Sequence, residues 1–397
     1  MTSSPRPTLG VGLIGYAFMG AAHSQAWRTA PHFFDLPVRP ELTVLAGRNS
    51  AAVTSAADRL GWASTETDWR RVIERDDVDL VDVCTPGDTH AEIAIAALEA
   101  GKHVLCEKPL ANSVAEAEAM TDAAARAAER GVRSMVGFTY RRVPAATFAR
   151  DLVAAGRIGE IRQVRASYRQ DWLMDAEGPM TWRLDKDRAG SGALGDIGAH
   201  AIDLSEYITG LRLASVSGVI DTIVTERPLL AEGVGLSGTA STERGTVTVD
   251  DIALFSGRYA GAAGAYAPLG TFEATRFATG RKNALRIEVS GSLGAVAFDL
   301  ERMNELDFYD ATLPATEQGF RKILVTEHDH PYLAPWWPPG HMLGYEHGFS
   351  HQAVDFVNAI VAGEQPRPSF EDGLHVQRVL DAVERSSAAG SSWITTD

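Results

Sequence analysis

The sequence predicts an α/β protein of two domains: a doubly wound parallel sheet in residues 1–137, then an α+β domain with a large, open, mostly antiparallel sheet in residues 138–397. Three observations support this. The 397 residues exceed what one typical hydrophobic core accommodates. Apolar strand-like runs alternate regularly with helical patterns as far as Gly137. Beyond that residue, strand-like runs dominate and only a few helical patterns interrupt them.

Strands and helices are expected in alternation through the first third. The strands should lie at 9–15, 42–46, 79–84, 103–106 and 133–138, and the helices at 21–29, 50–60, 68–74, 91–100 and 114–130. Residues 31–41 are expected to form a loop. Ligands of parallel sheets bind beyond the carboxyl ends of the strands, so the residues at these ends should line one crevice. They are Gly15, Gly47, Thr85, Glu107, Lys108 and Tyr140.

The second part is expected to form a largely antiparallel or mixed sheet. Its strand patterns lie at 161–172, 214–224, 246–254, 270–275, 285–289, 295–300 and 322–325. Helical patterns lie at 142–155, 190–203, 345–361 and 374–387.

Composition excludes several classes of protein. The net charge of −15 argues against a nucleic-acid partner, which requires a basic surface. Cys84 and Cys106 lie in apolar runs and are expected to be reduced core thiols. Residues 1–8 lack the apolar segment of a signal peptide, and no stretch approaches the roughly 18 apolar residues of a membrane span. We therefore expect a cytoplasmic protein without a membrane partner.

Five histidines near the C-terminus do not predict a metal site. They are His328, His330, His341, His347 and His351. Their spacing fits no zinc motif, and the prolines among them indicate an irregular loop. We expect no metal cofactor.

The segment Gly15-Tyr16-Ala17-Phe18-Met19-Gly20 predicts a dinucleotide site. It follows an expected strand and precedes an expected helix, as the Rossmann fingerprint does, with Ala17 in place of the second glycine. The N–H groups at the helix start can bind a pyrophosphate. The second strand ends in Arg48 and Asn49 without the usual acid, and Arg48 chemically favours the 2′-phosphate of NADP.

A glycine-rich helical stretch, residues 190–203, carries a carboxylate and an imidazole one turn apart, Asp196 and His200. Histidine titrates near neutral pH, so His200 is our candidate for the general base that removes a hydroxyl proton. Asp196 either binds substrate hydroxyls or orients His200. Asp203, on roughly the same face, could support these groups from behind, but it is expected to be a surface acid of the helix.

Three pieces stand together: the glycine loop with His23 just after it, Cys106-Glu107-Lys108-Pro109, and Gly195-Asp196-Ile197-Gly198-Ala199-His200. This combination resembles the glucose–fructose oxidoreductase and inositol dehydrogenase (Gfo/Idh/MocA) family. The resemblance runs over nearly the whole chain. It implies a Rossmann domain, a second domain whose open sheet carries the substrate site and often the oligomer interface, and NAD(P)-dependent oxidation of a ring hydroxyl on a sugar or cyclitol. A homo-oligomer, dimer or tetramer, is expected.

Further segments resemble the levoglucosan dehydrogenase and glycoside 3-dehydrogenase branch of that family. They include Tyr140-Arg141-Arg142, Gln170-Asp171-Trp172 and Glu273-Ala274-Thr275-Arg276. Members of this branch use NAD, which we favour over NADP. The branch implies levoglucosan, or a glycoside oxidised at C3, as substrate.

The resemblance assigns roles to residues of this chain. Lys108 would donate to the reacting oxygen, and Glu107 would meet the cofactor or hold Lys108. The cofactor would contact Gly15, Ala17, Phe18, Met19, Gly20, Arg48, Asn49, Thr85, Pro86, His90, Glu107 and Lys108. The substrate would contact Lys108, Tyr140, Arg141, Asp171, Trp172, Trp182, Arg183, Asp196, His200, Arg276 and Tyr345.

Other functions remain open at this point. An inositol dehydrogenase would share every motif. Imine, dihydrodiol or biliverdin-type reductases of the same fold usually lack the paired Asp and His. A dinucleotide-binding sensor or regulator without catalysis would keep the glycine loop but could lose Lys108 or His200, both of which are present.

Overall fold

The computed structural model describes residues 6–234, 237–261 and 266–397. The chain divides into two compact units. The first consists of residues 1–139 and 345–374, and the second of residues 140–344 and 375–397. The division of the chain into domains at residue 137 stays a prediction. The units of the structure differ from it in that each is made of two separate stretches.

The first unit is built on a six-stranded sheet in which every pair of neighbours is parallel. Its order is β3-β2-β1-β4-β5-β6. The strands are β1 (Thr8–Ile14), β2 (Arg39–Ala46), β3 (Ser64–Glu66), β4 (Leu80–Val83), β5 (His103–Cys106) and β6 (Ser134–Val136). The order reverses between β1 and β4, the place where parallel sheets of this type bind ligands. The predicted doubly wound sheet is confirmed.

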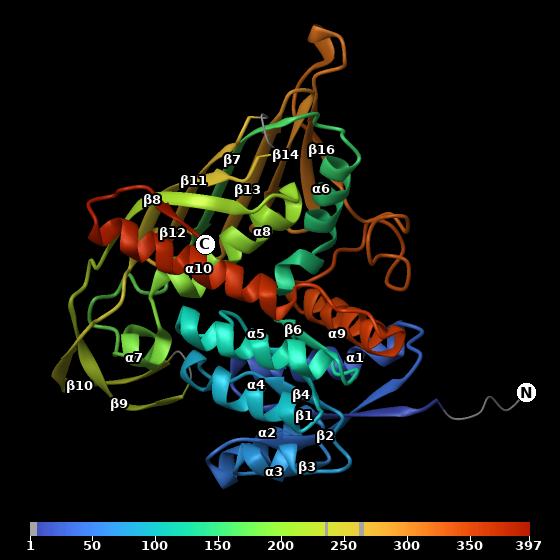
Figure 1. The fold of residues 1–397 in the computed structure, drawn as a ribbon, viewed down its shortest axis with the longest axis vertical. Coiled ribbons are helices and arrows are strands. Elements are labelled where there is room, and N and C mark those ends of the chain that lie inside the picture. Colours follow the sequence, from blue (N-terminus) through green and yellow to red (C-terminus); the bar gives the residue numbers. More distant parts are fainter. Residues whose placement is uncertain (1–5, 235–236, 262–265) are drawn as a thin grey trace, which may run out of the picture. The chain divides into compact units, whose positions relative to one another are not determined.

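Helices connect these strands, and one further helix arrives from the distant stretch 345–374. They are α1 (Phe18–Phe33), α2 (Ser50–Leu60), α3 (Trp69–Ile73), α4 (His90–Glu99), α5 (Val114–Ala128) and α9 (Tyr345–Ala362). Figure 1 shows α9 beside α1 and α4 beside α5. Apolar residues of α9, among them Phe349 and Phe356, belong to the same buried cluster as Trp27 of α1 and Leu13 of β1. Helix α9 thus completes the core of the first unit.

The second unit contains a nine-stranded mixed sheet and a two-stranded hairpin. The order of the large sheet is β16-β15-β14-β13-β7-β12-β11-β8-β17, and only β7 and β12 pair in parallel. The strands are β7 (Ile161–Arg169), β8 (Leu213–Asp221), β11 (Ile252–Tyr259), β12 (Leu269–Thr275), β13 (Ala284–Gly291), β14 (Gly294–Asp299), β15 (Glu305–Asp310), β16 (Arg321–Leu324) and β17 (Ile394–Thr395). The hairpin pairs β9 (Glu226–Val234) with β10 (Ser237–Thr246). The expected mostly antiparallel sheet is confirmed.

Helices cover one face of the large sheet. Figure 1 shows α6 (Pro144–Ala154) and α8 (Ala199–Thr209) lying against it, while α7 (Lys186–Ala189) is a single turn. Helix α10 (Phe370–Ala388) begins in the first unit and continues in the second. Side chains of β7 alternate accordingly: Val164, Ala166 and Tyr168 are buried, whereas Arg165 is exposed on the other face.

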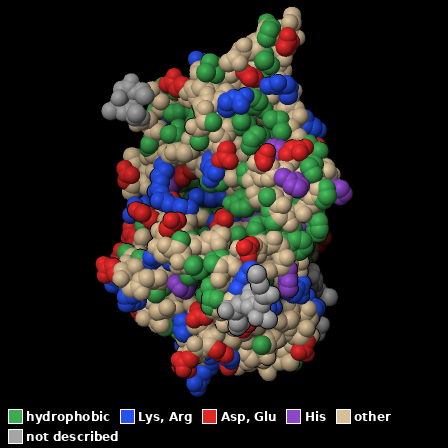
Figure 2. All heavy atoms as spheres, turned by 90° about the vertical axis from the view of Figure 1, so that its right-hand side faces the viewer, with side chains coloured by type: hydrophobic (Ala, Val, Ile, Leu, Met, Phe, Trp, Pro, Cys, Tyr) green, Lys and Arg blue, Asp and Glu red, His purple; other side chains and the backbone are tan. Residues whose placement is uncertain are grey.

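The open face of this sheet is hollowed and charged. A hollow of about 570 Å³ is lined by acidic and basic side chains, among them Arg165, Glu273, Arg286, Glu288 and Asp299. On the face of the molecule in Figure 2, acidic and basic side chains are likewise interspersed. In the part of the chain that the structure describes, no helix combines the length and apolar character needed to cross a membrane.

Several boundaries differ from the sequence-based expectations. Helix α1 continues through Pro31 to Phe33 and β2 begins at Arg39, so the expected loop 31–41 is shorter. The run 246–254 is not one strand, because β10 ends at Thr246 and β11 begins at Ile252. Strands β3, β9, β15 and β17 were not expected, and β10 was expected only at its last residue, Thr246. Asn49 is the N-cap of α2 and accepts from the Ala52 N–H at 3.0 Å, and the helix ends at Gly61 (φ 85°).

Candidate active site

The turn after β1 depends on two glycines at close approaches of backbone. Gly15 has φ 102°, and a Cβ there would lie 2.6 Å from the Cys84 carbonyl oxygen. A Cβ on Gly20 would lie 2.0 Å from the Gly15 carbonyl oxygen. Real Cβ atoms essentially never come closer than 3.0 Å, so both positions require glycine. The first and last glycines of the fingerprint therefore make the tight turn and seat the helix on the strand.

The start of α1 fits a pyrophosphate. Ala17 is its N-cap and provides no side-chain hydrogen bond, and the first turn carries no acidic residue. Its N–H groups and positive dipole end therefore suit an anion. Phe18 is 59% exposed and its ring stacks on that of Tyr345, at 6.1 Å between centroids. Met19 packs at the edge of the core of the first unit. Tyr345 thus lies with the glycine loop.

Residues 47–49, directly after β2, combine a glycine in contact with an aromatic ring and an exposed arginine. The Tyr16 ring covers Gly47 so closely that a Cβ there would lie 2.0 Å from Cε1. Arg48 follows and is exposed, and Asn49 caps α2. No acidic side chain stands at residues 47–49.

The loop after β4 is tied to the loop after β5 by one buried histidine. The His90 ring nitrogens lie 2.9 Å from the Thr85 carbonyl oxygen and 3.0 Å from that of Pro109. Thr89 Oγ donates to Thr85 Oγ and to the Pro86 carbonyl. Because His90 is only 1% exposed, it would act on a cofactor through these loops rather than by contact.

Glu107 and Lys108 follow β5 and meet a buried polar network. His23 of α1 lies between two carboxylates: its Nδ1 is 2.9 Å from Asp82, and its Nε2 is 3.0 Å from Glu107. Trp27 Nε1 also donates to Asp82, at 2.7 Å. The other Glu107 oxygen accepts the backbone N–H of Lys108 at 3.3 Å, and the Lys108 side chain is half-buried.

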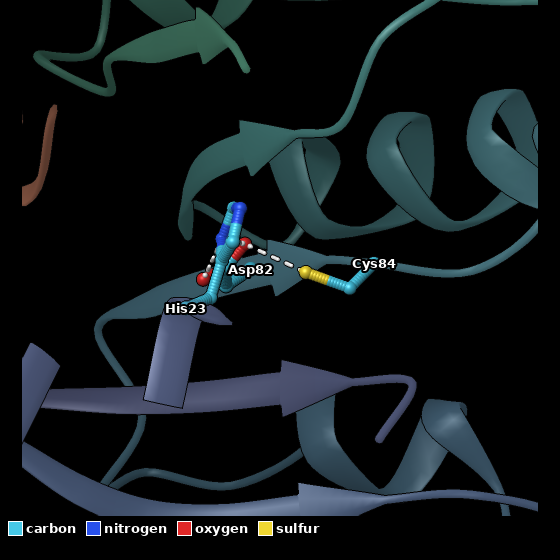
Figure 3. A group of neighbouring side chains, drawn as sticks. All are labelled: His23, Asp82 and Cys84. Carbon is cyan, nitrogen blue, oxygen red and sulfur yellow. Dashed lines mark hydrogen bonds and ion pairs between the residues drawn. The ribbon is translucent and has the colours of Figure 1, made fainter. Parts of the chain in front are cut away.

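Figure 3 shows His23 of α1, Asp82 of β4 and Cys84, the residue after β4, pointing toward one another. Their candidate ligand atoms lie within 4.8 Å of one another, as a metal site requires. Hydrogen bonds from His23, Trp27 and Cys84 already occupy the Asp82 carboxylate. Burial raises the pKa of the Cys84 thiol, which disfavours the thiolate that a metal would need. These contacts therefore describe a hydrogen-bonded network.

In the second unit, the predicted helix 190–203 is two elements. A π-helical turn (Leu194–Gly198) carries Asp196 and leads into α8, which carries His200. Such turns are frequent at functional sites. Asp250 holds the start, because its carboxylate accepts the N–H groups of Gly192 (2.6 Å) and Leu194 (2.7 Å). A Cβ on Gly192 would lie 1.7 Å from the Asp250 carbonyl oxygen, so this close approach accounts for the glycine.

Two arginines act on the Asp196 carboxylate, whose side chain is 26% exposed, and each of them stacks on a tryptophan. Arg276 Nη1 lies 3.7 Å from it, and the guanidinium lies over the Trp172 ring at 5.5 Å. Arg183 stacks on Trp182 at 4.4 Å. Burial lowers the pKa of Arg183, and the negative charge of Asp196 opposes that shift. The Asp196 carboxylate thus faces the positive charges of two guanidinium groups.

Arg276 is fully buried yet incompletely hydrogen-bonded. Its Nη2 donates to the Asp250 carbonyl at 3.1 Å. Within the described ranges, neither its Nε nor its Nη1 has a hydrogen-bond partner. Buried donors without partners are rare in proteins and are expected to meet a ligand or water. This is the strongest local sign of a polar ligand beside Asp196.

His200 lies against two tyrosine rings. Its ring centroid is 4.4 Å from that of Tyr140 and 5.9 Å from that of Tyr168. The tyrosine hydroxyls lie 2.8 Å apart, and Tyr168 donates to Asn283 Oδ1 at 2.6 Å. Gln170 donates to the same oxygen and accepts from the Trp172 indole N–H. A hydrogen-bonded chain therefore runs from beside His200 to Trp172.

Two predicted residues are bound by other side chains. Arg141 makes a bidentate pair with Asp203, with contacts from 2.5 to 3.1 Å. Asp203 is 2% exposed, so the expectation of a surface acid is wrong: the arginine pairs it inside the unit. Asp171 accepts from Lys282 at 2.8 Å and from the Gly280 N–H at 3.1 Å, and these contacts lower its pKa.

Comparisons with known proteins agree with this geometry. The family described as oxidoreductase family, NAD-binding Rossmann fold, matches residues 9–138. The GFO/IDH/MocA C-terminal domain matches residues 147–297. The chain belongs to the Gfo/Idh/MocA family. As a Gfo/Idh/MocA protein it is an NAD-binding oxidoreductase of the sugar and polyol dehydrogenase type.

Relatives within the Gfo/Idh/MocA family span the whole chain. Levoglucosan dehydrogenase of Pseudarthrobacter phenanthrenivorans is 42% identical over 97% of both chains. Inositol 2-dehydrogenase of Rhizobium meliloti is 26% identical over 96% of this chain and 97% of its own. A solved levoglucosan dehydrogenase in complex with NADH superposes with a TM-score of 0.91 at 40% identity, covering 98% of this chain and 99% of the other. A Kribbella flavida oxidoreductase domain protein reaches 0.93 at 65% identity, covering 98% and 100%.

The structure thus groups the predicted residues by unit. The cofactor candidates and Tyr345 lie in the first unit, and the remaining substrate candidates other than Lys108 lie in the second. Sequence reasoning noted His23 only as part of the family motif and gave it no role, and it missed Asp82, Tyr168, Asn283 and Asp250 as site residues. Tyr168 lies on the strand that leads to Gln170 and Asp171, two residues before Gln170, which is a signal that could have found it. The others act across long sequence separations and left no such signal.

Proposed function

We propose that this enzyme oxidises a ring hydroxyl of a sugar to a ketone, with NAD as the hydride acceptor. The observation that carries the proposal is the Asp196 carboxylate among Arg276, Arg183 and two tryptophans, one helical turn from His200. Polar donors beside aromatic faces suit the hydroxyls and the apolar faces of a sugar ring. Levoglucosan, or a glycoside oxidised at C3, is the first candidate, because identity to levoglucosan dehydrogenase (42%) exceeds that to inositol 2-dehydrogenase (26%).

Three side chains carry the proposed chemistry. His200 accepts the hydroxyl proton and returns it in the reverse direction. Asp196 binds substrate hydroxyls or orients His200. The Lys108 ammonium donates to the reacting oxygen and stabilises the negative charge that develops there. NAD, when bound, supplies the hydride acceptor.

The proposed substrate anchor is Arg276. A ring hydroxyl that accepts from its Nε or Nη1 would satisfy the buried donors that lack partners in the described residues. The Trp172 and Trp182 rings would pack on the sugar faces, and Arg183 would donate to a second oxygen. Tyr140 and Arg141 are proposed to shape this pocket, Arg141 through its pair with Asp203.

NAD is the proposed cofactor, although Arg48 alone would suit the 2′-phosphate of NADP. The support is the levoglucosan dehydrogenase solved with NADH. Initial rates with each cofactor test this proposal. A kcat/KM for NADP at or above that for NAD would overturn it, and Arg48→Ala should then lower only the NADP value.

The substrate test follows the absorbance of reduced nicotinamide with levoglucosan, simple glycosides and inositols. We expect turnover on a sugar and little on inositols. Lys108→Ala and His200→Ala should each lower kcat by about 100-fold or more, since one acid–base or electrostatic group typically supplies that much. Arg71→Ala, at an exposed position of α3, is the control. Tight NADH binding without turnover on any polyol would overturn the proposal.

We also propose a homo-oligomer assembled through the open face of the nine-stranded sheet. Its charged hollow offers acidic and basic partners to a second copy. Light scattering of the wild type and of Arg286→Glu tests this proposal. A monomeric wild type would contradict it.

A further inference from the structure

A buried polar network of His23, Asp82 and Glu107 ends at the residue before Lys108, and the proposed function assigns it no role. His23, Asp82 and Glu107 are 1%, 0% and 5% exposed. They come from α1, β4 and the residue after β5, three places brought together only by the fold. Polar groups buried this deeply cost free energy unless each finds a partner, so their arrangement has to be explained.

The geometry requires two N–H donors on one imidazole. Nδ1 faces both oxygens of Asp82, at 2.9 and 3.0 Å, and Nε2 faces Glu107 at 3.0 Å. Carboxylates only accept, and a neutral imidazole donates from one nitrogen, whereas an imidazolium donates from both. An imidazolium also balances one of the two buried negative charges.

The surrounding groups agree with a charged ring. Burial alone would lower the pKa of His23, but Asp82 more than offsets this, and the pKa lies well above its usual value. The other titratable groups facing the ring are Glu107 and the Cys84 thiol, whose pKa burial raises so that it stays neutral. Helix α9 presents the uncharged Phe349 ring at 5.4 Å.

Glu107 is held on both sides. Its Oε1 meets His23, its Oε2 accepts the Lys108 backbone N–H, and a Cβ on Gly137 would lie 2.4 Å from Oε1. The carboxylate therefore cannot move without losing the histidine or striking the neighbouring backbone. Through it, the position of His23 is transmitted to the backbone of Lys108.

We propose that His23, as an imidazolium clamped between Asp82 and Glu107, is a positioning residue that fixes Glu107 and, through it, Lys108. The role of Lys108 rests on the proposed function above, whereas the clamp itself does not. The His23 clamp contributes by orienting Lys108. Orientation matters because a displacement of about 1 Å in a reacting group can lower the rate about 100-fold.

The clamp is tested first without catalysis. In the full-length protein with nitrogen-15-labelled histidine, one imidazole should carry protons on both nitrogens at about pH 8, where ordinary histidines are neutral. Its signals should vanish in His23→Gln, which assigns them. A His23 ring with one unprotonated nitrogen at that pH would overturn the proposal.

Two variants then separate orientation from folding. The His23→Asn amide reaches the position of Nδ1 and keeps Asp82, whereas the His23→Gln amide reaches that of Nε2 and keeps Glu107. Both lose the charge and the contact with Phe349, so we expect similar decreases in Tm. We expect kcat to fall about 10–100-fold in His23→Asn and less than about 5-fold in His23→Gln, with KM for NAD within about 3-fold. His103→Gln, in the same unit, is the matched control.

The outcomes distinguish the two proposals. Equal kcat for the two His23 variants, or a His23→Asn enzyme within about 2-fold of wild type, overturns the positioning role. If Lys108→Ala keeps near-normal turnover, the proposed function of the lysine fails instead, while the nitrogen-15 result still decides whether the clamp exists. If neither variant folds, the through-space contact of the imidazole with the Phe349 ring assigns its signals in the wild-type spectrum, which then decides.

Discussion

Gly192→Ala tests whether the start of the π-helical turn sets the geometry of the proposed catalytic groups Asp196 and His200. The new Cβ would lie 1.7 Å from the Asp250 carbonyl oxygen, and real Cβ contacts stay beyond 3.0 Å, so the two backbones must separate by about 1.3 Å. That movement strains the three hydrogen bonds from residues 192–194 to Asp250. The Gly192 carbonyl accepts the Asp196 N–H at 2.9 Å, so the shift reaches Asp196 directly.

The expected effect is larger on rate than on stability. Overpacking typically costs about 1–3 kcal/mol, or about 2–4 °C in Tm for each kcal/mol in a unit of this size. A displacement near 1 Å should lower kcat/KM by about 100-fold. Initial rates on a confirmed sugar and a thermal melt measure the two effects. Gly319→Ala, where a Cβ would meet nothing within 4 Å, is the control. A Gly192→Ala enzyme with kcat/KM within about 3-fold of wild type would refute the reasoning.

Two further predictions concern the surroundings of Asp196. Arg276→Lys keeps the charge but removes the planar fork, so KM for the sugar should rise about 10–100-fold in initial-rate measurements, while an unchanged KM would contradict the anchor. Burial raises the pKa of Asp250, so its contribution to stability is fully present below the unfolded pKa of about 4 and is lost as the pH rises through the folded pKa. Asp250→Asn should therefore show a flatter dependence of Tm on pH across that window, and parallel curves would contradict this.

Local patterns were enough to predict much of the first unit. The strands end where apolar runs meet glycine or proline, and the Asn49 cap and the Gly61 stop lie where local chemistry requires them. The three-residue strand β3 has no apolar run and forms because β2 provides hydrogen-bond partners. Likewise, α1 continues through Pro31 because α9 and β2 pack along it. Such tertiary contacts override local propensity.

For the candidate site, too, local patterns could be predicted from the sequence and tertiary contacts could not. Motifs indicated Lys108, Asp196 and His200 as candidates because the residues adjacent to each form a recognisable pattern. The partners that hold them come from far along the chain: Asp250 is 54 residues from Asp196, and Asp82 is 59 residues from His23. Only the folded topology brings such pairs together, so no pattern within a short window could reveal them.

Helix α9 has a consequence for how the chain is synthesised. The first unit lacks its residues 345–374 until nearly the whole protein has been made. Burial of Phe349, Val354, Phe356 and Val357 corresponds to about 6–12 kcal/mol, comparable with the total stability of an ordinary domain. A nascent chain that ends after β6 therefore exposes the apolar surface around Trp27 on the ribosome. The nucleotide-binding fold of this protein is completed only after strands β7 to β16 have been translated, and a fragment that ends after β6 should require α9 supplied in trans.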